Sequence, residues 1–418
     1  MNPKFENYFK EQGFEALTPI QAEVAPLLAQ EKSVLGLAPT GSGKTLAYAL
    51  PLLEQLLPKD GTQLLILAPS QELAAQLTNV IRPWAKLLEL NVLSLIGGAN
   101  VKRQIEKLKK LPEVVIGTPG RLLNLINDKK LKLHKLEAIV IDEADELLGE
   151  AETLADCREI ITHAPRTAGV SVFSATKGGI LSELHRWFGI EPTVIDVRQV
   201  DHTRGQVEHY LLEVPQRKRV DALRRLAQLD DFCALVFFKQ TAELNDAYEK
   251  LKHAHVNVAR LHSEQRQVER EQALRQLRKR EVALLLTTDV AARGLDIPGL
   301  PAVVNYDLPK NVNTYIHRVG RTGRMGADGT VINIGNERDL RMFKQLVKEK
   351  GYELEPVYLY QRQLVTDQNE LAELKKQAPS RPVRKKPNKP VTQAESAKKK
   401  RKKNRKRDQK NKGKRKKS

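Results

Sequence analysis

The chain has 418 residues, of which 40% are hydrophobic and 29% charged, so it is long enough for two or three domains with ordinary cores. No apolar stretch approaches the ~20 residues that a membrane-spanning helix needs, and Met1–Lys10 lacks the apolar segment of a signal peptide. We therefore exclude a membrane protein and expect a cytoplasmic one. Two cysteines, Cys157 and Cys233, are too few for a disulfide framework or a multi-thiolate metal site.

The basic residues are concentrated at one end of the chain. Of the net charge of +20, +18 comes from residues 381–418, which contain 20 Lys and Arg against Glu395 and Asp408. This segment has no aromatic residue, so it cannot bury enough surface to order itself, and we expect a disordered tail. Such dense Lys/Arg blocks are typical of arms that bind polyanions. A tail that only aids solubility is the alternative.

Short β-branched runs alternate with amphipathic stretches along the rest of the chain. In the first half, strands are expected at 33–37, 63–68, 92–96, 114–117, 138–141 and 170–174, with helices such as 71–88 and 99–110 between them. In the second half, strands are expected at 207–214, 234–238, 256–261, 282–287, 302–306 and 330–334, with a helix at 267–279. Apolar strands separated by helices predict mostly parallel sheets with helices on both faces, the α/β class.

A polar, aperiodic segment separates the two halves. It predicts a first domain at 1–197, a linker at 198–206, a second domain at 207–362 and a C-terminal extension at 363–418 that ends in the basic tail.

A glycine-rich segment follows the first expected strand. It reads Ala38-Pro39-Thr40-Gly41-Ser42-Gly43-Lys44-Thr45 and precedes a helical pattern. Apart from Ala38 it matches the P-loop G-x-x-x-x-G-K-[ST], in which backbone N–H groups approach phosphates closely. Lys44 then reaches the β- and γ-phosphates, and the Thr45 hydroxyl binds Mg²⁺. The segment predicts ATP and Mg²⁺ as cofactors.

An acidic run, Asp142-Glu143-Ala144-Asp145, follows the strand expected at 138–141. Asp142 stands where it can hold Mg²⁺, partly through water, and Glu143 where it can orient or deprotonate the attacking water. Alone, such a run reads as the solvated start of a helix. The preceding strand and the P-loop favour the catalytic interpretation.

The second half contains His317-Arg318-Val319-Gly320-Arg321-Thr322-Gly323-Arg324. Arginines at a spacing of three suit arginine fingers, which accelerate nucleotide hydrolysis by ~10³–10⁵. If they belong to the second domain, hydrolysis requires that the domains close. A basic loop on a nucleic-acid surface is the alternative.

Together these three motifs resemble those of the bacterial type of DEAD-box RNA helicases, of superfamily 2, over roughly residues 5–362. The resemblance implies two tandem RecA-like domains and an RNA-stimulated ATPase. Thr18-Pro19-Ile20-Gln21 resembles the Q motif, which implies that Gln21 reads the adenine edge while Phe5 or Phe14 packs on the base.

The resemblance implies roles for further residues. Asp145, Ser174 and Thr176 would couple hydrolysis to strand separation, His317 would couple the domains, Arg321 and Arg324 would contact the phosphates, and Asp296 would bind the ribose. RNA contacts are implied for Gln71, Gly98, Thr118, Arg121, Gln267, Arg270, Thr288 and Arg293. Where the family has P-T-R-E-L, this chain has Pro69-Ser70-Gln71-Glu72-Leu73, so Gln71 lacks the charged fork of arginine.

These observations predict a monomeric helicase that closes on RNA and melts short duplexes. The resemblance suggests ribosome assembly or RNA remodelling in the cold, with structured or ribosomal RNA and pre-ribosomal particles as partners. Two alternatives remain: a DNA translocase, and a binding protein that acts as an ATP-gated RNA clamp or passive RNA chaperone.

Overall fold

The computed structural model describes residues 1–97, 101–201, 203, 205–292, 295, 297, 299–324, 326–348 and 350–377, apart from the side chains of Gln267, Lys375 and Gln377. The tail expected at 381–418 lies outside these residues. The chain divides into the units Met1–Ala372 and Glu373–Ser418, and the two sheets described below belong to the first unit.

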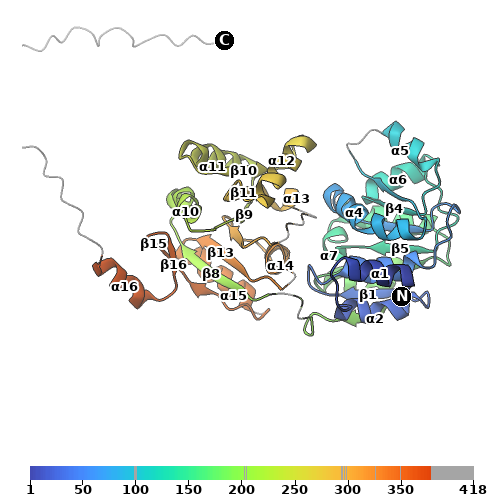
Figure 1. The fold of residues 1–418 in the computed structure, drawn as a ribbon, viewed down its shortest axis with the longest axis horizontal. Coiled ribbons are helices and arrows are strands. Elements are labelled where there is room, and N and C mark those ends of the chain that lie inside the picture. Colours follow the sequence, from blue (N-terminus) through green and yellow to red (C-terminus); the bar gives the residue numbers. More distant parts are fainter. Residues whose placement is uncertain are drawn as a thin grey trace, which may run out of the picture. The chain divides into compact units, whose positions relative to one another are not determined.

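The first sheet has seven parallel strands (Figure 1). They are β1 (Val34–Leu37), β2 (Leu64–Leu67), β3 (Val92–Leu95), β4 (Val114–Gly117), β5 (Ala138–Ile141), β6 (Gly169–Ser174) and β7 (Thr193–Asp196). Their order across the sheet is β3-β4-β2-β5-β6-β1-β7. In the register of this sheet, Leu35 of β1 lies opposite Val172 of β6 and Val194 of β7.

Helices cover both faces of the first sheet. One face packs against α1 (Pro3–Glu11), α2 (Pro19–Leu28), α3 (Lys44–Leu53) and α4 (Gln71–Leu87). The other packs against α5 (Val101–Leu108), α6 (Pro119–Asn127), α7 (Ala144–Leu147), α8 (Ala151–His163), η1 (Gly179–Ser182) and α9 (Leu184–Phe188). Because strand side chains alternate, β2 sends Leu64 and Ile66 into one core and Leu65 and Leu67 into the other.

The second sheet also has seven parallel strands. They are β8 (Val207–Glu213), β9 (Ala234–Phe238), β10 (Val258–Leu261), β11 (Leu284–Thr288), β12 (Ala302–Asn305), β13 (Gly329–Gly335) and β14 (Glu355–Pro356), in the order β10-β11-β9-β12-β13-β8-β14. The short helix η2 (Gln216–Lys218) leads into α10 (Arg219–Leu226), which covers one face with α11 (Thr241–His253). The other face carries α12 (Gln267–Arg278), α13 (Asp289–Ala292), α14 (Val312–Val319) and α15 (Glu337–Lys348).

A hairpin and a helix follow the second sheet. The strands β15 (Tyr358–Tyr360) and β16 (Gln363–Val365) pair antiparallel, and α16 (Gln368–Gln377) comes next. The hairpin thus crosses residue 362, where we expected the second domain to end. The expected linker lies between the end of β7 and the start of β8.

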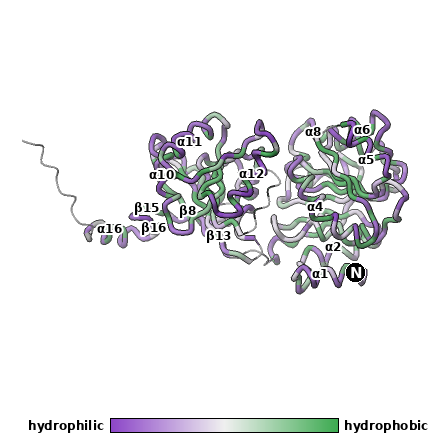
Figure 2. Tube along the Cα trace, turned by 45° about the horizontal axis from the view of Figure 1, so that its top comes forward, coloured by the Kyte–Doolittle hydropathy of each residue, from purple (hydrophilic) through white to green (hydrophobic). Residues whose placement is uncertain are grey.

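All twelve expected strands are present, within a few residues of their predicted ends. β7, β14 and the hairpin were not predicted. The α/β fold with two parallel sheets is confirmed. Figure 2 shows the apolar strands inside each half and hydrophilic residues on the outer helices. Both cysteines are buried. Within the described part of the chain, we find no helix whose length and hydropathy suit a membrane crossing.

Candidate ATP and RNA site

The P-loop connects β1 to α3. Gly41 and Gly43 have φ values of 90° and 84°, a conformation that residues with a side chain seldom adopt. The Lys44 Nζ donates to the carbonyl oxygens of Ala38 and Pro39 at 2.7 and 2.8 Å. The Ser42 Oγ is buried and has no hydrogen-bond partner among the described residues. A glycine-rich turn with a buried polar atom suits phosphate oxygens.

Gln21 of α2 lies directly against the P-loop. Its Nε2 donates to the Gly43 carbonyl at 3.3 Å, and its Oε1 accepts from the Thr18 backbone N–H at 3.0 Å. A methyl group on Gly43 would lie 2.6 Å from the Gln21 Nε2, so glycine is also required here for this close approach. Gln21 therefore stands beside the residues that we expect to bind phosphate.

The aromatic residues proposed to pack on the base differ in exposure. Phe5 of α1 is fully enclosed, with its ring centroid 5.7 Å from that of Trp84. Phe14 is half-buried and contacts Phe9. Of the two, only Phe14 has accessible surface for an adenine.

Asp142 is buried at the end of β5. One of its oxygens, Oδ2, accepts from the Tyr48 hydroxyl at 2.9 Å, and the other accepts from the Glu143 N–H at 2.9 Å. Burial, followed by the charge of Glu143, raises the pKa of Asp142 to about 6. The Glu143 Oε2 is buried without a hydrogen-bond partner among the described residues, and Glu143 has a φ of 47°. Two adjacent, poorly solvated carboxylates favour a bound cation.

The arrangement around Tyr48 fits Mg²⁺. The Tyr48 hydroxyl donates to Asp142, and Thr45 lies about one helical turn before Tyr48 on α3, so both expected ligands lie near one tyrosine. Their hard oxygen atoms are of the type that Mg²⁺ prefers, and this ion needs only one or two carboxylates when phosphates and water complete its shell. No sequence pattern predicted Tyr48, which sits on α3 one helical turn after Lys44 and Thr45.

Asp145 is the centre of a second cluster. Its Oδ2 accepts from the Thr176 hydroxyl and lies 3.0 Å from the His317 Nε2. The Ser174 hydroxyl donates to the Thr176 carbonyl at 2.8 Å, which fixes the turn after β6. Burial alone would raise the pKa of Asp145, but the hydrogen bond from His317, the charge of His317 and the hydrogen bond from Thr176 lower it to about 2.

His317 lies on α14 and belongs to the second sheet's half of the chain. Burial opposes its positive charge, but the hydrogen bond to Asp145 and the charges of Asp145, Glu143 and Glu146 raise its pKa. A charged His317 therefore forms an ion pair with Asp145 that connects the DEAD segment with the HRVGRTGR segment.

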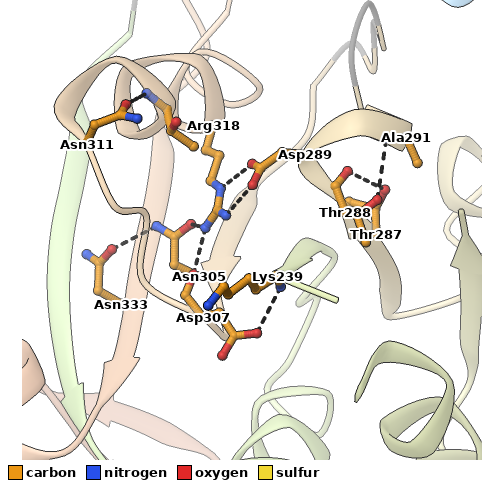
Figure 3. A network of polar contacts seen from close by, with 11 residues as sticks. Lys239, Thr287, Thr288, Asp289, Ala291, Asn305, Asp307, Asn311, Arg318 and Asn333 are labelled. Carbon is orange, nitrogen blue, oxygen red and sulfur yellow. Dashed lines mark hydrogen bonds and ion pairs between the residues drawn. The ribbon is translucent and has the colours of Figure 1, made fainter. Parts of the chain in front are cut away.

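The three arginines of that segment have different surroundings. Arg318 is buried and makes two bonds to the Asp289 carboxylate, at 2.6 and 2.7 Å, and further bonds to the Asn305 Oδ1 and the Asp307 carbonyl (Figure 3). Its guanidinium is thus committed within the second half. Arg321 is also buried, and its Nη1 donates to the Leu295 carbonyl at 2.7 Å.

Arg324 and Gly320 lie against the P-loop. A methyl group on Gly41 would be 3.4 Å from the Arg324 Cγ, and one on Gly320 would be 2.9 Å from the Thr40 Cβ and Oγ1. The Arg324 Nε donates to the Gly320 carbonyl at 2.6 Å. Glycine at 320 therefore allows the arginine segment to approach the phosphate loop.

The expected RNA residues are arranged along the strand ends. Gln71 is exposed at the start of α4, and a methyl group on Gly97 would be 2.8 Å from its Nε2. Thr118 precedes α6, and the Arg121 Nε donates to the Ile96 carbonyl at 3.4 Å. Thr288 ends β11. Gly98, Arg293, Asp296 and the side chain of Gln267 lie outside the described residues.

Arg270 is engaged by protein groups. Its Nη2 donates to the Glu72 carboxylate at 2.7 Å and to the Ala291 carbonyl at 3.3 Å, and its Nη1 donates to the His262 carbonyl at 3.0 Å. The RNA role of Arg270 stays a prediction. Glu72 had no predicted role, although it follows Gln71 directly.

A P-loop, a buried DEAD run and an arginine segment on two parallel sheets define an ATPase with two RecA-like domains. The DEAD/DEAH box helicase family matches residues 18–182, and the helicase conserved C-terminal domain matches residues 218–326. The chain belongs to the DEAD-box family of ATP-dependent RNA helicases, which are RNA-stimulated ATPases. This membership favours an RNA helicase over a DNA translocase.

Similar proteins include two from Bacillus. The chain is 43% identical over 350 residues to the probable ATP-dependent RNA helicase YfmL of Bacillus subtilis, covering 83% of this chain and 92% of the relative. It is 38% identical over 352 residues to the DEAD-box ATP-dependent RNA helicase CshC of Bacillus cereus, covering 84% and 90%.

Among solved structures, yeast (S. cerevisiae) Dbp5 bound to RNA and ADP BeF3 has a TM-score of 0.78 at 26% identity, covering 90% of this chain and 97% of that one. Mss116p bound to single-stranded RNA and AMP-PNP shares the fold, with a TM-score of 0.74 at 24% identity, covering 85% and 77%.

Proposed function

We propose that this helicase works as an ATP-driven clamp whose two RecA-like domains close on RNA. The observation that carries this proposal is the 3.0 Å contact between the Asp145 Oδ2 and the His317 Nε2, because it joins the acidic motif to the arginine motif. The domain limits remain those proposed from the sequence, 1–197 and 207–362. Moving such a clamp from 1:99 to 99:1 closed takes ~5.5 kcal/mol of differential binding, which ATP and RNA can supply together.

The first domain is proposed to bind ATP and Mg²⁺. Gln21 would read the adenine, Mg²⁺ would be held by Thr45 and Asp142, and the phosphates by the P-loop residues Thr40, Gly41, Ser42, Gly43 and Lys44. The bound ion would supply charge stabilisation at the phosphates. The proximity of Gln21 to Gly43 and of Thr45 to Asp142 supports this assignment.

Hydrolysis is proposed to need both domains. Glu143 would hold the attacking water and accept its proton, for which its buried Oε2 is suited. Arg321 and Arg324 would stabilise charge on the γ-phosphate, and Asp296 would bind the ribose. The position of Arg324 beside Gly41 supports a role at the phosphates.

RNA is proposed to contact both domains through its phosphates and sugars rather than its base edges. The residues are Gln71, Gly98, Thr118 and Arg121 in the first domain, and Gln267, Arg270, Thr288 and Arg293 in the second. Closure would bend one strand and melt a short duplex, and Asp145, Ser174 and Thr176 would couple it to hydrolysis. The bonds of Thr176 and His317 to one carboxylate support this coupling.

Ribosome assembly or RNA remodelling in the cold is the setting that we propose, with a monomer acting in the cytoplasm on structured or ribosomal RNA and pre-ribosomal particles. The 20 basic residues of the tail support a polyanionic partner. An ATP-gated clamp that binds RNA without separating strands is the second candidate, and the replacement of arginine by Gln71 favours it.

Glu143→Gln tests the clamp. The amide cannot accept the water's proton, so we expect ATP-dependent RNA binding with hydrolysis at least ~10²-fold slower and RNA release slowed in parallel. The measurement is single-turnover hydrolysis together with RNA release after a chase. Glu152→Gln is the matched control, since Glu152 is an exposed glutamate of α8. Wild-type release rates in Glu143→Gln would contradict the proposal. ATP-dependent RNA binding by the unmodified protein without any strand separation would favour the second candidate, the ATP-gated clamp.

A further inference from the structure

The β15–β16 hairpin has an unusual turn. Gln361 and Arg362 connect the two strands, and their φ values are 40° and 65°. A two-residue turn with positive φ at both positions normally contains Asn-Gly or Gly-Gly, because other residues seldom adopt this conformation. Strained backbone of this kind persists where its surroundings hold it, and it is concentrated at functional sites. The turn places Arg362 at an exposed tip.

The two faces of the hairpin are chemically different. Leu359 and Leu364 lie opposite each other and pack against the apolar core of the second sheet. Because side chains alternate along a strand, Tyr358 and Tyr360 lie on the other face. Both tyrosines are half-buried, and the Tyr360 hydroxyl accepts from the Gln361 Nε2 at 3.3 Å. The same face carries Val365, which lies opposite Tyr358 and is buried, so the two half-buried rings lie between a covered end of the hairpin and the exposed arginine of the tip.

The hairpin is attached to a basic helix. The Arg225 Nη2 donates to the Leu359 carbonyl, which joins α10 to β15, and the two elements lie side by side in Figure 1. Residues 216–226 contain five Lys and Arg against Asp221. Arg225 is exposed, whereas Arg224 pairs with Asp221 at 2.7 Å. Arg219 is buried and pairs with Asp307 and Asp339, so the positive charge beside the hairpin is that of Arg225 and, at the tip, Arg362.

We propose that Tyr358, Tyr360, Arg362 and Arg225 form an auxiliary site for single-stranded RNA that extends beyond the helicase core. Tyrosine rings and guanidinium groups stack on unpaired bases, and the arginines also neutralise phosphates. The bases of a duplex are already stacked, so the site selects unpaired RNA. The basic residues of 381–418 follow this hairpin and α16 in the sequence.

The site lies outside the ATP pocket and the motif residues. It therefore changes the affinity for RNA with a single-stranded extension, and leaves ATP hydrolysis at saturating RNA as it is. It also tolerates most sequences, because every base has a face on which a ring can stack.

The test compares two RNAs in the full chain: a blunt duplex, and the same duplex with a single-stranded extension of ten uridines. Stacking of one base supports roughly a tenfold change in affinity, so Tyr360→Ala should weaken binding of the extended RNA by about tenfold and leave the blunt duplex within twofold. Tyr360→Phe keeps the ring and should bind as the unmodified protein does.

Tyr248→Ala is the matched control, since Tyr248 is a half-buried tyrosine of α11 in the same half of the chain. Arg362→Gln should lower the salt dependence of binding to the extended RNA by about one unit of slope. Ultraviolet crosslinking of 4-thiouridine in the extension should modify the peptide that contains residues 358–362. Unfolding midpoints of the variants equal to that of the unmodified protein exclude misfolding.

Three results would overturn the proposal: equal losses for blunt and extended RNA in Tyr360→Ala, loss in Tyr360→Phe as large as in Tyr360→Ala, or crosslinks that avoid residues 358–362. The proposal would also fail if the hairpin variants left both RNA affinities unchanged but lost binding to an acidic protein. The partner of the hairpin would then be a protein and not RNA.

Discussion

The two parallel sheets have the same strand order, yet different loops follow corresponding strands. The orders β3-β4-β2-β5-β6-β1-β7 and β10-β11-β9-β12-β13-β8-β14 coincide when seven is added to each number of the first. β1 is followed by the glycine-rich P-loop, whereas β8 is followed by Val214-Pro215-Gln216-Arg217-Lys218, which has no glycine. The scaffold is shared, and the loops at its strand ends determine which chemistry each half performs.

The ends of β5 and β12 show the same contrast. After β5, Asp142 has a raised pKa and hydrogen-bonds Tyr48, and it lies beside the P-loop. After β12, the Asp307 Oδ2 accepts from the Lys239 N–H at 2.9 Å, and Asp307 pairs with Arg219 at 3.5 Å. The carboxylate of Asp307 therefore binds groups of the second half and stabilises the fold there. Corresponding places in the two halves therefore differ: we assign a ligand to the first, whereas the second binds groups of the protein itself.

Lys44 and Lys218 provide the strongest test of this contrast, because each follows the corresponding strand of its sheet. Lys44→Ala removes a charge that we assign to the β- and γ-phosphates, so RNA-stimulated phosphate release should fall below detection. Lys218→Ala should retain turnover within twofold, since its loop has no glycine to bring N–H groups to a phosphate. Equal activity of the two variants would refute the P-loop assignment.

Arg321→Ala tests the contribution of the second half to hydrolysis. Loss of a finger should lower kcat about 10³-fold while ATP affinity, measured with a fluorescent nucleotide, changes little. Because Arg321 is buried, its removal could destabilise the fold. The unfolding midpoint of Arg321→Ala is therefore compared with that of Arg321→Lys, which keeps a charge but loses the planar fork. Turnover near the unmodified rate in Arg321→Ala would remove this residue from the mechanism.

A smaller effect is expected from pH, through the ion pair between the halves. The pKa of His317 is raised in the folded chain, so the stabilisation from its pair with Asp145 is complete below about pH 6.5 and is lost as the pH rises through the raised value. RNA affinity with a non-hydrolysable nucleotide should therefore weaken a few-fold from pH 6.5 to 9. His317→Gln should reduce this dependence, and an identical pH profile in the variant would assign it to other groups.

Much of the fold could be predicted from the sequence because the central strands are apolar on both faces. β2 and β4 are completely buried, and their runs of Leu, Ile and Val stand out locally. β7 was missed because it is a short edge strand with mostly exposed residues, defined by its pairing with β1 rather than by its own pattern. The β15–β16 turn was missed because Gln361-Arg362 has none of the usual turn residues.

The candidate site divides along similar lines. Contiguous motifs such as the P-loop and the DEAD run carry their chemistry in local spacing, so they were recognised. Tyr48 and Glu72 act through partners more than 90 residues away, Asp142 and Arg270, and no local pattern predicts such pairs. The three arginines are equally spaced, so the sequence could not show that Arg318 differs from the other two. Its guanidinium hydrogen-bonds Asp289 and Asn305.

The two buried thiols have a practical consequence for labelling. Cys157 and Cys233 are enclosed, and burial raises the pKa of both thiols, so neither should react readily with a maleimide in the native protein. One cysteine introduced on the surface of each half would then carry a donor and an acceptor dye without removal of the natural ones. Opening and closing could be followed on single molecules of an otherwise unaltered chain.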